Sequence, residues 1–492
     1  MIKQMVARME RKDWAIGSIL IIATLSRIVN LGTLALIGDE SYYWLWSRHL
    51  DWSYLDHPAG VALVVRLSTA LGGQSETGVR WLNALLGAGA VFLTYQLGQQ
   101  ILSRQAGLFA AFLVAVGAPY LVTSRFVYTD ALYLFFLLLN LYNFWRLVEE
   151  KPSPDLKTGV AFGASLALLF NTKYSAYLYA LALLTAMMID HRCLLAQRSI
   201  WLGGLIGMLG LCPAILWNVT HDWVSFRWQL SHLAVNVSGR YSLAGNISHS
   251  LAYFSWPLLA LALAGLGRVR SAPERLFSLI ALFLILPIAL SPANSPRNLS
   301  AGLVPLLLLA GTRWPATLRG RRQQRMAGLL TIGAAATAIY GAGTVMNLFG
   351  PSVWPHSSVT PAIRQDAAGW RRLGPVLSTH PTPIFALDYS IASQINYYAG
   401  RPAYTAWKQY RLWGIPDLSD TTIVGLHYLS QDLISASLRD AFQHVEGPER
   451  LQFTEYGATK KVYVWQAKGL RWNKEKFLQQ FDFLTFLKIR VK

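Results

Sequence analysis

Eleven apolar runs dominate this sequence and limit what it can fold into. A helix needs about 20 mostly apolar residues to cross a bilayer, and runs of about this kind lie at roughly 14–36, 78–102, 105–121, 127–148, 157–171, 174–189, 199–217, 248–267, 275–291, 298–312 and 326–348. Only 14% of the 492 residues are charged, whereas a soluble domain carries about 25%. The sequence therefore predicts a polytopic α-helical membrane protein with about 11 spans.

Basic residues between these runs predict the orientation of the chain. If the N-terminus is cytoplasmic, the cytoplasmic loops hold most of the Lys and Arg, including the cluster Arg319, Arg321, Arg322 and Arg325. Membrane proteins favour basic residues on this side, so residues 37–77 and everything after about Gly350 are expected outside the cytoplasm. The same loop clusters account for the net charge of +19, and we therefore reject nucleic acid as a partner.

Composition divides the chain into two expected domains. Residues 1–349 form a transmembrane domain with the outer loop 37–77, and residues 350–492 form an extracytoplasmic soluble α/β domain. In the second domain PIFALDY and TTIVGLHYL have the pattern of buried strands, SIASQINYYAG and LISASLRDAFQHV that of helices, and LQFTEYG to KKVYVWQA that of a hairpin. Cys193 and Cys212 are the only cysteines, so no disulfide framework or cysteine metal cluster is expected.

Residues 38–58, GDESYYWLWSRHLDWSYLDHP, place acidic and aromatic side chains directly after the first apolar run. Acidic groups are expensive near hydrocarbon, so their presence beside a span indicates function. The adjacent carboxylates of Asp39 and Glu40 point apart, so one is expected to face a cavity while the other orients it or caps a helix. Partial desolvation makes a carboxylate a better base, and we predict Asp39 as catalytic and Glu40 as substrate-binding. A capping role at a helix start is the alternative.

Asp56 and His57 close the same loop, and Tyr43 belongs to its aromatic band. A carboxylate beside an imidazole suits a hydroxyl-rich ligand or a metal. No further spaced His or acidic cluster lies nearby, so we predict substrate contact for Asp56, His57 and Tyr43 rather than a metal site. The alternative for Asp56 is a helix N-cap with Pro58 in the first turn.

Four further residues lie at the outer ends of expected spans. Lys173 occupies a short outer turn, where a cation opposes the topology preference and is explained by a bound phosphate. Arg297 precedes the span at 298–312, where a planar guanidinium and a helix N-terminus suit phosphate oxygens. Lipid headgroups are the alternative ligand for both cations. Asp130, which could simply offset a helix dipole, and His221 in the second outer loop complete the predicted substrate-binding set.

Seven segments carry a resemblance to a known family: GDESYYWLWSRHLDWSYLDHPAG, GVRWLNALLG, YTDALYLFF, NTKYSAYL, PAILWNVTHDWVSFRWQ, SPRNLSAGLVPLLLLAG and LDYSIASQINYYAGRPAY. They resemble membrane glycosyltransferases of the GT-C type, most closely the bacterial branch related to protein O-mannosyltransferases and the lipid A aminoarabinose transferase. In that family Asp39 matches the acid of the first outer loop, Asp130 a second acid, and Arg297 a basic position facing donor phosphate. Asp56 and His57 depart from the acid followed by Lys that the aminoarabinose transferases show.

The resemblance implies an inverting glycosyltransferase at the periplasmic face of the bacterial inner membrane. Asp39 would take the proton of an acceptor hydroxyl, which displaces polyprenyl phosphate from the anomeric carbon, while Lys173 and Arg297 stabilise the leaving group. The implied partners are a polyprenyl-phosphate-linked sugar donor, membrane lipids, and an acceptor on lipid A, another cell-envelope glycan or a protein. This scheme requires no cofactor and leaves a divalent metal open.

Two other functions fit part of the pattern. A polyprenyl-linked lipid transporter or flippase is the first alternative, although transporters favour mid-membrane polar groups and repeated halves. Here the ionisable residues gather at the ends of spans and no repeat is visible, which favours a transferase. An oligosaccharide ligase, which uses a lipid-linked chain in place of one sugar, is the second alternative.

Overall fold

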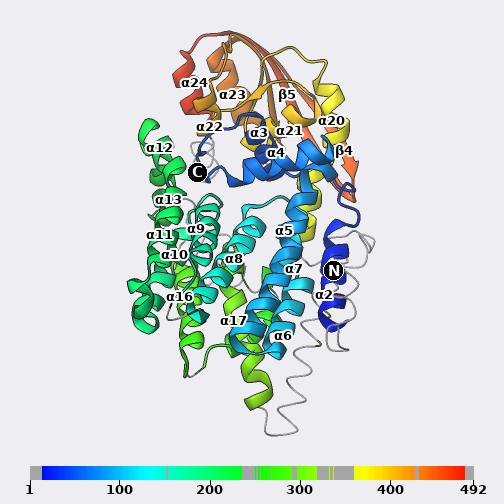
Figure 1. The fold of residues 1–492 in the computed structure, drawn as a ribbon. Helices are drawn as coiled ribbons and strands as arrows, with labels where there is room; N and C mark the ends of the chain where they lie inside the picture. The colour runs from blue at the N-terminus through cyan, green and yellow to red at the C-terminus, as the bar shows by residue number, and fades with distance from the viewer. Residues whose placement is uncertain are drawn as a thin grey trace.

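The computed structural model describes residues 14–150, 153–234, 256–267, 269–290, 296–317, 359–426 and 431–482, together with positions 250, 253, 254, 332 and 336. Long helices form a bundle, and a five-stranded sheet with its own helices lies at one end of that bundle (Figure 1). Two short helices, α3 (Gly38–Arg48) and α4 (Gly60–Gly72), lie between the bundle and the sheet (Figure 1). The acidic and aromatic loop predicted from the sequence is therefore the junction between the two parts.

The bundle is built from helices most of which follow the predicted apolar runs, and α13 lies in the predicted second outer loop. In chain order they are α2 (Trp14–Ile28), α5 (Glu76–Leu97), α6 (Arg104–Val116), α7 (Ala118–Arg125), α8 (Thr129–Glu149), α9 (Leu156–Phe170), α10 (Ala176–Asp190), α11 (Arg198–Leu209), α12 (Cys212–Thr220), α13 (Val224–Ala234), α15 (Trp256–Ala264), α16 (Ala272–Leu290) and α17 (Ser300–Thr317). A π-helical turn (Gly98–Leu102) follows α5, and 3-10 turns lie at Arg192–Ala196 and Pro296–Leu299.

Few of these helices are both long and apolar enough to cross a membrane. Within the described residues, Thr129–Glu149 and Arg198–Thr220 are long and apolar enough to cross a membrane, and α6 with α7 forms a third candidate that is bent by 58°. The expected total of about 11 spans stays a prediction. Nearly all of the expected span at 326–348, and the expected domain boundary at 349/350, lie outside the described residues.

The run predicted as one span at 105–121 is broken between α6 and α7. Pro119 stands in the first turn of α7 and removes a backbone donor there. The carbonyls left free at the end of α6 accept hydrogen bonds from buried Arg27, which reaches Ala115 O at 3.0 Å and Val114 O at 3.1 Å. A buried guanidinium thus satisfies the backbone where the helix ends.

The C-terminal part contains a mixed sheet in the strand order β2-β1-β3-β5-β4. Strand β1 (Ile384–Ala386) is parallel to β2 (Ala403–Tyr404) and to β3 (Asp420–Leu426), whereas β5 (Ala458–Leu470) is antiparallel to β3 and to β4 (Phe442–Glu455). Its helices are α19 (Val359–Ala367), α20 (Trp370–Leu377), α21 (Tyr389–Tyr398), α22 (Lys408–Trp413), α23 (Gln431–Ala441) and α24 (Lys474–Gln480). Gly369, which has a φ of 81°, lies between α19 and α20.

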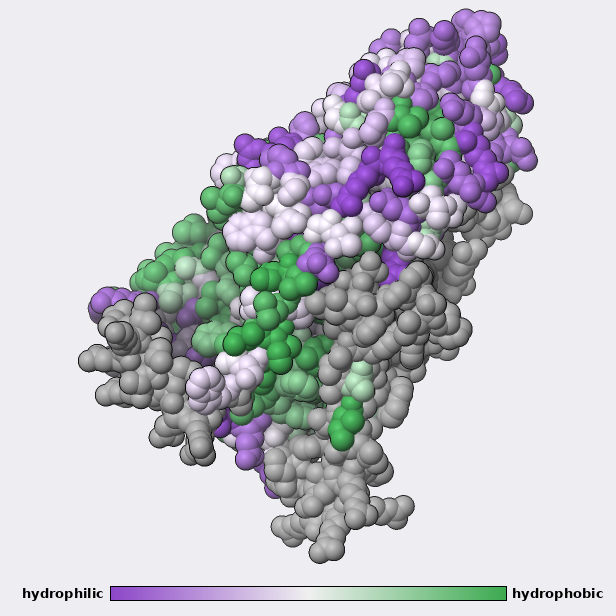
Figure 2. Space-filling view, turned by 90° about the vertical axis from the view of Figure 1, so that its right-hand side faces the viewer, coloured by the Kyte–Doolittle hydropathy of each residue, from purple (hydrophilic) through white to green (hydrophobic). Residues whose placement is uncertain are grey.

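One apolar core joins the α3–α4 loop to the C-terminal part. Trp46 and Tyr54 of the loop belong to the same buried cluster as Trp370 and Ile391. On the face shown in Figure 2, hydrophilic residues dominate the upper end and hydrophobic ones the described part of the bundle below. Because a large apolar interface restrains relative motion, the C-terminal part holds the loop in a defined position on the bundle.

Candidate active site

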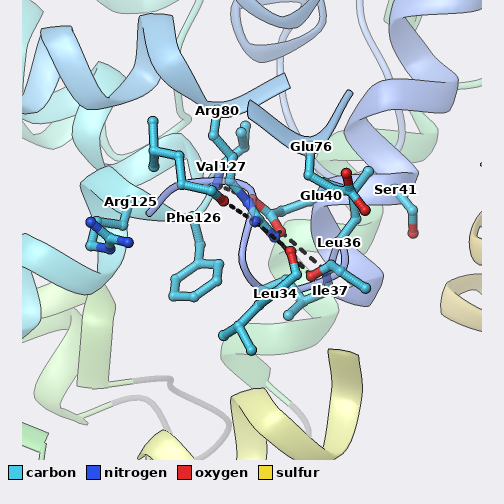
Figure 3. Close-up of polar contacts among 12 residues, drawn as sticks. Leu34, Leu36, Ile37, Glu40, Ser41, Glu76, Arg80, Arg125, Phe126 and Val127 are labelled. Atoms are coloured by element: carbon cyan, nitrogen blue, oxygen red, sulfur yellow. Dashed lines mark hydrogen bonds and ion pairs between the residues drawn. The ribbon is translucent and has the colours of Figure 1, made fainter. Parts of the chain in front are cut away.

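A buried ion pair fixes the start of helix α3 (Figure 3). Glu40 has no exposed surface, and its Oε2 and Oε1 accept hydrogen bonds from Arg80 Nη2 at 2.6 Å and Nε at 2.8 Å. The same carboxylate accepts from the backbone N–H groups of Ile37 at 3.0 Å and Val127 at 2.9 Å. Four donors therefore saturate Glu40, and it holds the first turn of α3 against the start of α8.

This position corrects the expectation that Glu40 contacts substrate. A carboxylate with no exposed surface and four protein donors has no face left for a ligand. The neighbouring acids do point apart, as their adjacency predicts, and Glu40 caps the helix from inside its first turn. Asp39 is the partly exposed member, with 22% of its side chain accessible.

Asp39 lies between donors from two distant parts of the chain. Arg297 Nη1 donates to its Oδ2 at 3.2 Å, and the hydroxyl of Tyr389 donates to its Oδ1 at 3.0 Å. Arg297 comes from the 3-10 turn before α17, and Tyr389 is the first residue of α21. The structure thus pairs the predicted base with one of the predicted phosphate ligands, and adds a tyrosine that the sequence did not single out.

Lys173 and Asp130 form a second ion pair near the first. Lys173 Nζ lies 2.8 Å from Asp130 Oδ1 and donates to Asn298 Oδ1 at 2.6 Å. Burial lowers the pKa of Lys173, and the charge of Asp130 offsets part of that effect. Asn298 follows Arg297 directly, and the guanidinium of Arg297 stacks 4.5 Å from the ring of Tyr128. Lys173, Asp130 and Arg297, distant in sequence, thus converge at one end of the bundle.

Asp56 is held by aromatic donors from both sides of the junction. Its Oδ1 accepts from Trp228 Nε1 at 3.0 Å, and its Oδ2 accepts from the hydroxyl of Tyr42 at 3.3 Å. Burial, together with the nearby charge of Asp39, raises the pKa of Asp56 to about 7, and the two hydrogen bonds offset part of this rise. Trp228 belongs to α13, so the second outer loop does reach the first, as their shared side predicted.

His57 and Tyr43 pack together beside these groups. Their rings are 6.3 Å apart, and the Nδ1 of His57 is buried with no hydrogen-bond partner among the described residues. Burial, together with the positive charges of Lys173 and Arg297, lowers the pKa of His57 well below its usual 6.5. Burial and the charge of Asp39 raise the pKa of the Tyr43 phenol. At neutral pH His57 is therefore an uncharged imidazole and Tyr43 a protonated phenol.

His221 lies apart from this cluster. Its ring stacks on Trp217 of α12 at 4.1 Å, and its Nδ1 is 2.8 Å from the carbonyl of the same residue. Trp217 in turn donates to Asp51 Oδ2 at 2.7 Å. These local contacts explain His221 as part of the end of α12, and they do not support its predicted contact with substrate.

Backbone contacts fasten the C-terminal part to the segment before Asp39. The hydroxyl of Tyr398 accepts from Leu36 N at 2.7 Å, and Gln394 Nε2 donates to Leu36 O at 2.6 Å. Gly38 N donates to Asp366 Oδ2 at 2.9 Å. A Cβ on Gly38 would lie 2.4 Å from the Cβ of Ser390, so only glycine permits this approach of α3 to α21.

No group of three or more His, Cys, Asp or Glu suited to a metal ion occurs among the residues that the structure describes. Asp56 and His57 supply two such side chains, and the nearby cations Lys173 and Arg297 oppose a further positive charge. The residues in this part of the chain therefore fit a phosphate better than a metal. The expectation that no cofactor is required stays a prediction.

Comparison with known proteins supports the class that the sequence suggested. A family model described as dolichyl-phosphate-mannose-protein mannosyltransferase matches residues 56–217. The lipid A galacturonosyltransferase RgtD of Rhizobium johnstonii is 26% identical over 209 residues, which are 40% of this chain and 42% of the relative. The chain thus spans about two-fifths of the length of that relative.

Solved structures show the same fold. ArnT from Cupriavidus metallidurans, bound to undecaprenyl phosphate, aligns with a TM-score of 0.64 and 15% identity over 92% of this chain and 98% of its own. The archaeal oligosaccharyltransferase AglB from Archaeoglobus fulgidus aligns with a TM-score of 0.52 and 14% identity over 80% of this chain and 64% of its own.

The chain therefore has the GT-C membrane fold with a C-terminal sheet region, which confirms the resemblance to GT-C glycosyltransferases. The family model and the relative are both glycosyltransferases, so the same class is indicated by sequence and by fold.

Proposed function

We propose that this protein is an inverting glycosyltransferase of the bacterial inner membrane. It moves a sugar from a polyprenyl phosphate to a hydroxyl or phosphate of lipid A, another cell-envelope glycan or a protein, on the periplasmic face. The observation that carries the proposal is the convergence of Asp39 with Arg297 and Lys173 beneath the C-terminal part. The lipid A galacturonosyltransferase relative and the undecaprenyl phosphate held by ArnT support the acceptor and donor classes.

The geometry divides the reaction among three charged residues. Asp39 accepts the proton of the acceptor hydroxyl while the acceptor oxygen forms a bond to the anomeric carbon. The bond from that carbon to the phosphate oxygen breaks, and its electron pair leaves with polyprenyl phosphate. Attack opposite the phosphate inverts the anomeric centre. Arg297 and Lys173 stabilise the charge that develops on the leaving phosphate, because both sit in a partly desolvated site.

The neutral groups of the site suit the sugar. The Nδ1 of His57, which has no partner among the described residues, and the protonated phenol of Tyr43 offer uncharged hydrogen-bonding atoms near the cations. Asp56, already held by Trp228 and Tyr42, presents a carboxyl whose charge changes near neutral pH. Such groups recognise hydroxyls without competing for the phosphate.

Two measurements test the proposal. Mass spectrometry of lipids and glycans from cells with and without the gene should show a difference of one hexose, uronic acid or aminosugar. An unchanged glycome with altered lipid sidedness would instead support the transporter. In proteoliposomes, Asp39→Asn should insert normally and lose transfer by about 10²- to 10⁴-fold, whereas Asp51→Asn in the same loop should stay near the wild-type rate. Wild-type turnover by the purified Asp39→Asn protein would refute the assignment of the base.

A further inference from the structure

Both carboxylate oxygens of Asp39 are occupied, and the donors differ in kind. Oδ2 is engaged by Arg297 at 3.2 Å, a cation of the bundle, and Oδ1 by Tyr389 at 3.0 Å, a phenol of the C-terminal part. A base needs one free lone pair directed at the proton that it abstracts. The way in which these two donors share Asp39 therefore decides which oxygen meets the acceptor.

Tyr389 is rigidly placed. It begins α21, whose N-cap Asp388 accepts a hydrogen bond from Ser390 N at 2.8 Å. Its ring lies 4.8 Å from that of Tyr42 and 5.1 Å from that of Trp407. The charge of Asp39, followed by burial, raises the pKa of the Tyr389 phenol well above its usual 10. The phenol therefore keeps its proton and acts toward Asp39 only as a donor.

Arg297 is partly exposed and has donors for a second partner. Its side chain is 32% exposed, and its guanidinium carries five N–H donors in a planar fork. A phosphate diester beside it offers oxygens that compete with Oδ2 for these donors. Arrival of the sugar donor thus weakens the bond to Oδ2, whereas the bond from Tyr389 to Oδ1 has no such competitor.

We propose that Tyr389 is a positioning residue for the transfer reaction: it holds Oδ1 of Asp39 so that Oδ2 meets the acceptor hydroxyl once donor phosphate engages Arg297. The inference rests on the proposed function and deepens it, because a residue of the C-terminal part then orients the proposed base. It also predicts that the sugar donor binds before the acceptor.

Tyr389→Phe in the full-length protein tests this role, since the ring and its packing stay. Measured in proteoliposomes with a polyprenyl-phosphate sugar, kcat should fall about 10- to 100-fold, with the KM for the donor within about twofold. Tyr397→Phe is the matched control: it removes another tyrosine hydroxyl of α21, which donates to Gln74 O at 2.7 Å and does not touch Asp39.

The outcomes separate the two proposals. If wild-type and Tyr397→Phe proteins transfer sugar and Tyr389→Phe matches them in kcat, the positioning role is overturned and the proposed function stands. Equal losses of kcat in Tyr389→Phe and Tyr397→Phe would show that Tyr389 only helps to attach the C-terminal part, and they would also overturn the positioning role. If the wild-type protein transfers no sugar at all, the proposed function fails as well.

Discussion

Arg80 and Glu40 form a bidentate ion pair that solvent does not reach, with side chains 1% and 0% exposed. Arg80 also donates to the carbonyls of Leu31 at 2.6 Å, Leu34 at 2.8 Å and Ala35 at 2.8 Å. The chain between α2 and α3 therefore wraps around one guanidinium. Because Asp39 precedes Glu40, this wrapping sets where the proposed base can lie.

Removing the charge of Glu40 should destabilise the junction. Glu40→Gln leaves a buried guanidinium without its counter-ion, and breaking such a pair costs about 3 kcal/mol or more in the free energy of unfolding. Denaturant unfolding of the detergent-solubilised protein measures this cost. Glu475→Gln, which removes the exposed partner of Arg411, should change the same quantity by less than about 1 kcal/mol. Equal stability of the Glu40→Gln and wild-type proteins would contradict the role assigned to the pair.

Lys173 should determine affinity for the donor phosphate. Lys173→Gln should weaken binding of undecaprenyl phosphate by about 10- to 100-fold, because a charge-assisted hydrogen bond is lost. The single variant also leaves Asp130 unpaired, so the double variant with Asp130→Asn separates stability from binding. The double variant should regain thermal stability and still bind weakly. Recovery of affinity in the double variant would show that Lys173 serves only the ion pair.

Asp56 should make stability depend on pH. Its pKa in the folded protein is about 7, above the usual 3.8, so the folded state binds more protons than the unfolded state between these values. The free energy of unfolding should therefore be highest at low pH within this window and fall as pH rises from about 4 to about 7. Asp366, with a pKa raised by burial to about 6, adds a smaller fall of the same sign. The difference in the free energy of unfolding between pH 5 and pH 8 should be smaller for Asp56→Asn than for the wild-type protein. An equal difference in the two proteins would show that Asp56 is not its cause.

Gly38 should be required for the approach of α21 to α3. In Gly38→Ala the new Cβ would lie 2.4 Å from that of Ser390, so the two helices must separate and the hydrogen bond from Tyr389 to Asp39 must lengthen. We expect a loss of transfer rate that Ser390→Gly in the same chain partly restores. Gly17→Ala, where a Cβ meets nothing within 4 Å, is the control. A fully active Gly38→Ala protein would show that sugar transfer does not require the close approach of α3 and α21.

Local patterns in the sequence predicted most of the secondary structure and the charged residues of the site. Apolar runs, the strand at PIFALDY and the hairpin near the C-terminus are each encoded by neighbouring residues, and so they could be recognised. Asp39, Lys173 and Arg297 stood out because charges are costly beside apolar runs. The partners of these charges could not be predicted. Arg297 pairs with Asp39, and Lys173 with Asp130, across more than 40 positions of the sequence. Such pairs depend on how the helices pack, which hydrophobic periodicity does not encode.

The positions of three residues could not be predicted for the same reason. Glu40 differs from Asp39 by one position in a helix turn, and only the location of Arg80 decides which of them is buried. His221 lies in an aromatic loop like that of the site, yet its ring turns back onto Trp217. Tyr389 follows a capping aspartate after a short strand, a pattern that indicates a helix start and says nothing of a partner in a loop 350 residues away.

The hydrogen bonds to Asp39 come from residues that follow it by 258 and 350 positions. Translation therefore produces the acid before either of its two donors. The phenol arrives only when α21 has been synthesised and packed against Gly38. A chain interrupted before α21 would carry the acid without the phenol that contacts its Oδ1.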